Sequence, residues 1–312
     1  MTKPITFIKA ISLVIIFLGI CFLSLTVGPM GFKVPREVIF GIRLPRLLLG
    51  IFAGISLSVS GASLQGILQN PLADPYILGI SGGACVGAVL AVLLKLPVSP
   101  FAFLGALICI GMVYKLASFK GRIPKDTLLL SGVVVGMFAS AVVMLVMSLA
   151  GRDLQEMIYL LMGHLGMIFG TMSFRVFWVV FGISILILVL IIRRARELNI
   201  LALGKEEALT LGVEVEHLKK EIFINSSLLV GLCVSFCGAI GFIGLMVPHI
   251  TRRIVGPDHR VLLLFSPLVG VSLILVADIV ARNILAFELP VGVITALFGV
   301  PFFVWLLRKR KT

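Results

Sequence analysis

The sequence is poor in charged side chains and in the patterns from which most enzyme sites are built. Only 13% of its 312 residues are charged, and only 4 are histidines. Soluble domains carry about 25% charged residues, so this composition excludes an ordinary soluble fold. No H-E-x-x-H pattern occurs, and an enzyme that works inside the membrane is therefore a remote alternative.

Patterns that bind metals and nucleotides are also absent. None of the 5 cysteines belongs to a C-x-x-C pair or to a His/Cys group with metal-ligand spacing. A phosphate-binding loop requires Gly-Lys followed by Ser or Thr, whereas Gly204-Lys205 is followed by Glu206. We therefore expect this chain to bind no metal and no cofactor, and to hydrolyse no ATP itself.

Apolar residues, by contrast, make up 60% of the chain, and its mean hydropathy is +1.19. A helix needs about 17–25 apolar residues to cross a bilayer. Stretches of that length predict an all-α polytopic membrane protein, and they lie near residues 8–27, 44–68, 77–95, 101–118, 127–149, 174–192, 222–246, 261–281 and 290–307.

The placement of Lys and Arg adds a further helix to these stretches. Both residues concentrate in the cytoplasmic loops of membrane proteins. An extra short helix over residues 247–256 places most of the 27 Lys and Arg on the side of the N-terminus, whereas without it they divide almost evenly. We therefore predict about ten transmembrane helices in the cell membrane, with both termini cytoplasmic. The net charge of +13 follows from this bias beside anionic lipid and needs no nucleic-acid partner.

Two polar, proline-containing segments interrupt the apolar runs, at residues 60–84 and 238–260, with matching internal spacing. Gly61 lies ten residues before Pro71, and Gly238 lies ten before Pro248. Broken helices in a membrane survive only inside protein or beside a water-filled path, and matched breaks in two halves point to a transport route. The spacing predicts two inverted halves, each with a broken helix; in a chain with 32 glycines, chance is the alternative.

Eight residues are assigned a structural role at these breaks, and the polar ones are expected to bond freed backbone groups. They are Asn70, Pro71, Asp74, Pro75, Gly79, Pro248, His249 and Gly256. Glycines spaced four apart, such as Gly79/Gly83/Gly87 and Gly132/Gly136, predict helices that approach closely.

The chain has no separate soluble domain, so residues 1–312 are expected to form one transmembrane unit. Its first helix covers 8–27, its first half about 42–149 and its second half about 222–308. A cytoplasmic loop of about 193–221 separates the halves.

Six strings in this order resemble the FecCD-type permease family, whose members are membrane subunits of ABC importers for iron-siderophores, haem, cobalamin and some oxyanions. The strings are IRLPR (42–46), GASLQGILQNPLADPYILG (61–79), LALGKEEALTLGV (201–213), GFIGLMVPHITRRIVGPDHR (241–260), ADIVAR (277–282) and ELPVGVITALFGVPFFVWLL (288–307). The chain departs from the family at His164, where members often carry Gly or Ser, and at Pro267, which comes later than usual.

The resemblance implies a permease subunit that imports a metal chelate, with a ferric siderophore favoured over haem or cobalamin. It implies a second permease subunit, identical or paralogous, and two copies of an ABC ATPase that holds ATP and Mg. It also implies an extracytoplasmic solute-binding protein and contact of the permease with membrane lipid. The loop between the halves would seat on the ATPase through Leu203, Gly204, Glu206, Glu207, Ala208, Leu211 and Gly212; an ordinary connecting helix is the alternative.

Three arginines and four other side chains complete the candidate sites. Arg43, Arg46 and Arg282 are predicted on the outer side, against the charge bias. In similar permeases the matching arginines meet acidic residues of the binding protein, so docking is favoured over membrane anchoring. Side chains predicted to line the path are Ser140, Met144, Met147 and His164, for which packing or a structural role is the alternative.

A gradient-driven secondary transporter with inverted repeats is the competing hypothesis, since it would share the broken helices. Such a carrier would need ionisable relays within the membrane. Deep candidates are few, chiefly Asp278, so the importer is preferred.

Overall fold

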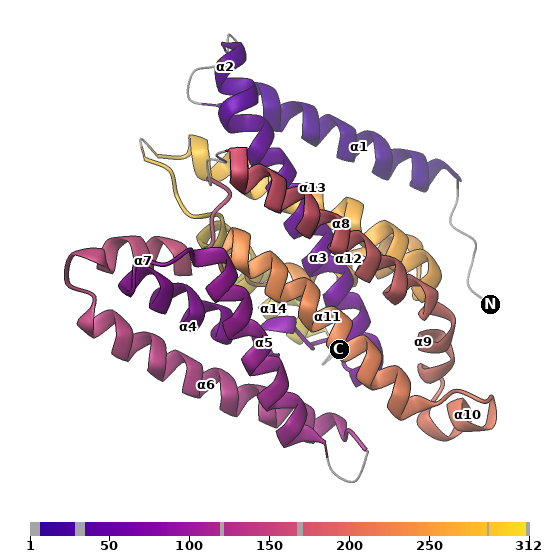
Figure 1. The fold of residues 1–312 in the computed structure, drawn as a ribbon. Helices are drawn as coiled ribbons and strands as arrows, with labels where there is room; N and C mark the ends of the chain where they lie inside the picture. The colour runs from indigo at the N-terminus through magenta and orange to yellow at the C-terminus, as the bar shows by residue number, and fades with distance from the viewer. Residues whose placement is uncertain (1–6, 29–34, 119–121, 167–170, 286, 310–312) are drawn as a thin grey trace.

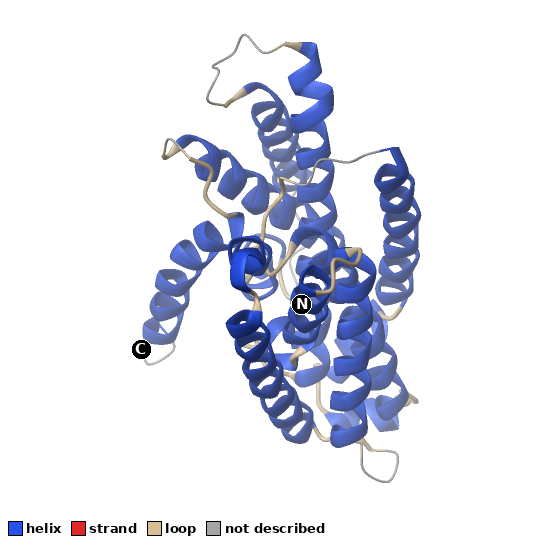
Figure 2. Ribbon diagram, turned by 60° about the vertical axis from the view of Figure 1, so that its left-hand side comes forward, coloured by secondary structure: helices blue, strands red, loops and turns tan. Residues whose placement is uncertain are grey.

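The computed structural model describes residues 7–28, 35–118, 122–166, 171–285 and 287–309. Within these ranges the chain is helical, and no residue of them forms a β-strand (Figures 1 and 2). The predicted all-α class is confirmed.

The first half begins with α1 (Phe7–Thr26) and a long helix that forms in three parts. These parts are α2 (Arg36–Val38), the π-helical η1 (Ile39–Arg43) and α3 (Leu44–Leu68). The 3₁₀ helix η2 (Pro75–Leu78), α4 (Ile80–Leu93), α5 (Val98–Ala117), α6 (Lys125–Leu149), the 3₁₀ helix η3 (Gly151–Asp153) and α7 (Leu154–Leu161) follow.

The remaining helices begin with α8 (Thr171–Arg193), which leads into two short helices. Those are α9 (Ala195–Leu201) and α10 (Lys205–Thr210). The second half comprises α11 (Val215–Cys237), α12 (Ile243–Val255), α13 (His259–Asn283) and α14 (Val291–Lys309).

Seven helices of the described chain are long and apolar enough to cross a membrane. Two shorter apolar helices, Ile80–Leu93 and Val291–Leu306, come close to that length. The helix α12 has only 13 residues, fewer than a full crossing needs. The total of ten crossings therefore stays a prediction.

The helix α3 forms the centre of the bundle. In its most apolar window 83% of the residues are buried, against 6% for α1. It packs against α11, α12 and α13, while α1 lies outside and contacts α13 (Figure 1).

Glycines let neighbouring helices approach closely, as predicted from their spacing. A Cβ atom added to Gly83 of α4 would lie 2.5 Å from the carbonyl oxygen of Gly105 in α5, and one added to Gly87 would lie 2.0 Å from that of Phe101. Backbone contacts of this kind are how helices pack where the solvent is lipid.

The boundaries of the second broken helix differ from the prediction. We expected one helix over 222–246 and a short one over 247–256, broken near Pro248. Instead α11 ends at Cys237, the break covers 238–242, and Pro248 lies inside α12. Gly238 (φ 65°) and Phe242 (φ 68°) adopt left-handed conformations that end one helix and start the next.

Matching spacing therefore does not give matching positions. Gly61 lies within α3 and Pro71 in the first break, whereas Gly238 lies in the second break and Pro248 in a helix. The equal spacing does not mark equivalent positions in the two halves, although each half does contain a broken helix.

Candidate functional site

The first break joins α3 to α4 and uses its polar side chains to satisfy the backbone. The Asn70 carboxamide oxygen accepts a hydrogen bond from the amide of Leu72 at 3.0 Å. The Asp74 carboxylate accepts one from the amide of Tyr76, also at 3.0 Å, and so caps η2. Both side chains thus bond backbone amides of the break, the kind of bond predicted for them.

Three further residues shape the first break. Pro71 lies in the turn, and Pro75 opens η2, where a missing N–H costs nothing. Gly79 has φ 75°, and a Cβ there would lie 2.8 Å from the carbonyl oxygen of Gly132 in α6. Only glycine meets both demands.

The residues predicted for the second break lie in or at the end of α12 and not in the break itself. Gly256 (φ 95°) ends α12 in the left-handed region, where glycine is favoured. The ring of His249 packs edge-on against Phe302, with centroids 5.9 Å apart, and its Nε2 has no hydrogen-bond partner within the described residues. The expected bond from His249 to freed backbone groups is thus not seen at Nε2.

The two breaks lie against each other, which is the main geometric result of the fold. A Cβ added to Gly61 of α3 would lie 1.9 Å from the carbonyl oxygen of Gly244 in α12, so the two backbones touch there. The amide of Ile240 in the second break donates to the Tyr76 hydroxyl of η2 at 2.5 Å. The amide nitrogen of Gln65 lies 3.4 Å from the Gly244 oxygen.

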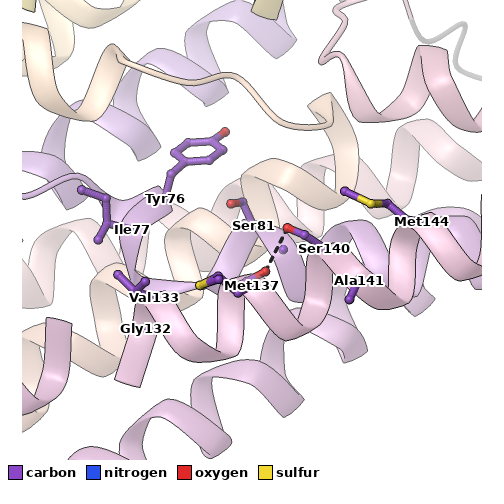
Figure 3. Close-up of a pocket in the computed structure, with 12 residues that line it drawn as sticks. Tyr76, Ile77, Ser81, Gly132, Val133, Met137, Ser140, Ala141 and Met144 are labelled. Carbon is purple, nitrogen blue, oxygen red and sulfur yellow. Dashed lines mark hydrogen bonds between the residues drawn. The ribbon is translucent and has the colours of Figure 1, made fainter. Parts of the chain in front are cut away.

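A groove of about 530 Å³ runs along α6 beside the first break. Figure 3 shows Tyr76, Ser81, Ser140 and Met144 along it, and none of the described residues that line it is charged. Met144 is 69% exposed, so the groove lies at the surface of this chain. The predicted pathway residues Ser140 and Met144 are thereby brought together with the first break.

The other two predicted pathway residues lie elsewhere. Met147 packs against the apolar cluster of Val89, Val143 and neighbouring side chains. His164 is buried beside the second break; its amide donates to the Cys237 carbonyl at 2.8 Å, and its ring meets that of Tyr159 at 4.9 Å. Burial lowers the pKa of His164, which favours the neutral imidazole.

The three arginines predicted on the outer side are buried in this structure. Arg46 pairs with Glu288 and lies 3.9 Å from Asp278, whose carboxylate also lies 3.0 Å from Nε of Arg282. Arg43 donates to the carbonyl of Leu25 at 2.7 Å. We refer to Arg46, Asp278, Arg282 and Glu288 as the arginine–carboxylate cluster.

The segment predicted to contact an ATPase forms the end of the molecule around α9 and α10, at the lower right of Figure 1. Leu203 and Leu211 are exposed by 67% and 60%, whereas Ala208 is fully buried and its amide donates to the Gly204 carbonyl at 3.1 Å. Its remaining predicted members are the exposed Glu206 and Glu207 and the left-handed Gly212.

Ion pairs hold this end to the bundle. Arg194 bonds Glu197 at 2.7 Å and Glu221 at 2.6 Å, and these hydrogen bonds, that to Glu221 foremost, raise the pKa of Arg194. Asn199 donates to Asp258 at 2.6 Å. Burial alone would raise the pKa of Asp258, but its hydrogen bonds outweigh burial and lower it.

Sequence reasoning missed Gln65, Tyr76 and Glu288. A glutamine in an apolar run is a signal in itself, because unpaired polar groups are costly in a membrane. No group of three or more His, Cys, Asp or Glu residues that could hold a metal occurs in the described part of the chain.

Comparison with known proteins gives one family. Residues 7–309 match the FecCD transport family. The chain is 47% identical to the cobalamin import system permease protein BtuC of Halobacterium salinarum, covering 91% of this chain and 78% of that one. It is 38% identical to the vitamin B12 import system permease protein BtuC of Escherichia coli, covering 97% and 94%.

Two solved structures of transport proteins have a fold similar to that of this chain. A structure described as a metal-chelate type ABC transporter in an inward-facing conformation superposes with a TM-score of 0.87 at 30% identity, covering 96% of this chain and 98% of that one. PsaBC of Streptococcus pneumoniae, in complex with Fab, shares the fold with a TM-score of 0.60 at 17% identity, covering 84% and 89%.

Proposed function

The chain belongs to the FecCD transport family and is a multi-pass permease of an ABC importer of the metal-chelate or vitamin B12 type, and from this premise we propose its cargo, partners and orientation. Both termini face the cytoplasm, a proposal supported by the bias of Lys and Arg along the sequence. We propose that the residues of the groove along α6 form part of the wall of the path that the cargo takes.

We propose that the cargo is a cobalamin-like corrinoid rather than the ferric siderophore favoured by the sequence motifs alone. Two relatives at 47% and 38% identity are named as cobalamin or vitamin B12 permeases. The uncharged lining of the groove suits a bulky chelate that passes without a fixed charge partner better than a bare cation or oxyanion.

The partners proposed are a second permease subunit, two ABC ATPase subunits that hold ATP and Mg, and an extracytoplasmic solute-binding protein. The surface position of the groove supports a second permease, which would supply the facing wall. Exposed Leu203 and Leu211 at the α9–α10 end support an ATPase, since large apolar side chains outside the membrane mark interaction sites.

A gradient-driven carrier is less consistent with the structure. Asp278, its chief candidate relay, lies between Arg46 and Arg282 and is engaged in structural ion pairs. Purification of the chain with its ATPase and binding protein, followed by reconstitution into vesicles, tests the proposal directly. ATP-dependent uptake of cyanocobalamin is expected; uptake driven by an ion gradient without ATP would overturn the ATP-driven mechanism, and uptake of a ferric siderophore alone would overturn the corrinoid assignment.

Breaking α10 is expected to uncouple the ATPase from the permease. The change Ala208→Pro removes the amide that donates to Gly204 and costs about 3 kcal/mol in a helix interior. Substrate-stimulated ATP hydrolysis should be lost while the permease still elutes as a folded protein. Thr210→Ala, whose hydroxyl bonds only Glu207 within α10, is the matched control. Normal stimulation in Ala208→Pro would mean that α10 does not transmit the signal.

The burial of the arginines gives the docking proposal a specific form. Arg46 is paired with Glu288, whose side chain is 48% exposed, so a carboxylate of the binding protein would have to replace Glu288. Exposed ion pairs are worth about 0.2–1 kcal/mol. Glu288→Gln is therefore expected to lower the Kd of binding-protein docking by about 1.4- to five-fold, most clearly at low salt.

The control for this change is Glu156→Gln, which removes an exposed acidic group from α7 without touching Arg46. Docking can be measured by surface plasmon resonance on nanodiscs. An unchanged or weaker affinity in Glu288→Gln would argue that the arginines serve the fold alone. Triple substitution of the arginines by glutamate is a poorer test, because it would also disrupt the buried pairs with Asp278.

A further inference from the structure

The side chain of Gln65 lies where the two broken helices cross. It is 3% exposed and projects from α3. Its amide nitrogen lies 3.3 Å from the carbonyl oxygen of Ala73 in the first break, and 3.4 and 3.5 Å from those of Gly244 and Leu245 in α12. An amide group has two hydrogens, so it can bond both segments at once.

The orientation of this amide is fixed by a charged neighbour. Arg252, near the end of α12, donates from Nη1 to the side-chain oxygen Oε1 of Gln65. A guanidinium can only donate, so the oxygen of Gln65 must face it and the nitrogen must face the three carbonyls. Gln65 therefore contacts α12 near both of its ends.

Pro248 explains why a side chain is needed at this position. In a regular helix the amide of residue 248 would donate to the carbonyl of Gly244, but proline has no N–H. An unpaired carbonyl inside a membrane bundle costs several kcal/mol. The amide of Gln65 supplies the missing donor from a different helix.

A second connection runs between the same two regions through α9. Gln69, at the end of α3, donates to the carbonyl of Leu201 at 2.7 Å. Asn199 of α9 accepts from the amide of His259 at 2.8 Å and donates to Asp258, just beyond α12. The α9–α10 end of the molecule, which is proposed to meet the ATPase, is thus bonded to the end of α3 and to the start of α13, the helix that follows α12.

We propose that Gln65 is a positioning residue for transport, which holds the two breaks together so that a displacement of α9 moves them as one unit. This inference rests on the proposed function and adds a residue to it that neither the groove nor the docking surfaces include. Its mechanical part, the joining of the breaks, is independent of what the protein carries.

Hydrogen exchange tests that part without any transport assay. In nanodiscs, Gln65→Met should raise the exchange rates of amides in residues 69–79 and in residues 243–247 together, by about ten-fold. Ser63→Ala is the matched control, since Ser63 is buried on the same helix and bonds only Val59 within it. Exchange at the wild-type rate, or a rise confined to one segment, would overturn the inference.

The importer reconstituted into vesicles tests whether Gln65 couples ATP hydrolysis to uptake. Gln65→Met is expected to reduce cargo taken up per ATP hydrolysed by about ten-fold, with basal hydrolysis within about two-fold of wild type, whereas a purely structural role would lower uptake and hydrolysis together. An unchanged ratio would overturn the role in coupling.

Gln65→Glu provides a second variant, because it keeps the acceptor for Arg252 but loses the donor to the carbonyls. It should behave like Gln65→Met in both assays, and it covers the case in which Gln65→Met does not fold. If wild-type protein shows no ATP-driven uptake, the proposed function fails, while the exchange rates still decide whether Gln65 joins the breaks.

Discussion

Replacement of Gly61 by valine is expected to prevent the bundle from assembling. A Cβ at this position would lie 1.9 Å from the carbonyl oxygen of Gly244 and 2.5 Å from its carbon. Both atoms belong to a helix backbone that cannot rotate away as a flexible side chain would. The expected loss is more than about 4 kcal/mol of folding stability, which is the range of severe steric changes. Size-exclusion chromatography in detergent should show aggregate instead of a monodisperse peak.

Gly111→Val is the matched control for this experiment. Gly111 lies on α5, and a Cβ there would meet nothing within 4 Å. The control should elute and unfold like the wild type. A monodisperse Gly61→Val protein with wild-type thermal stability would show that α3 and α12 do not touch at this point.

Neutralising Asp278 is expected to be the second most damaging change. Its carboxylate is 2% exposed and lies between Arg46 and Arg282. Removing one partner of a buried ion pair costs about 3–5 kcal/mol, because it leaves an uncompensated charge. Asp278→Asn should therefore lower the midpoint of thermal unfolding markedly, as measured by fluorescence-detected chromatography of heated samples.

A rescue experiment separates charge from packing at this position. Replacing both members of the pair, as in Asp278→Leu with Arg282→Met, removes the buried charges together and should recover most of the stability. If the free energy of unfolding of Asp278→Asn remained within about 0.5 kcal/mol of the wild-type value, the arginine–carboxylate cluster would not contribute to stability.

The sequence predicted the helical class and the first break well, because both depend on local chemistry. Apolar runs of membrane length give the helices, and Asn70 and Asp74 satisfy the backbone two residues further along the chain. The pairing of Asp278 with Arg282 at i, i+4 spacing was also within reach of sequence reasoning.

The second break was misplaced because its decisive contact is not local. Proline usually ends or kinks a helix, so Pro248 was the natural place to put the break. The amide of Gln65 compensates Gly244, although the two residues are 179 positions apart in the chain. Arg46 illustrates the same limit, since its partner Glu288 lies 242 positions away.

These distant partners impose an order on biosynthesis. A ribosome adds about 5–20 residues per second, so Gln65 waits roughly 10–40 s for Arg252, which lies 187 positions later. During that interval α3 is a newly inserted helix in which Gln65 lacks its partners on α12 and Arg46 lacks Glu288. The nascent chain therefore depends on lipid headgroups, water or the insertion machinery to shelter these groups, and a chain cut after α8 should be degraded rather than accumulate as a stable half.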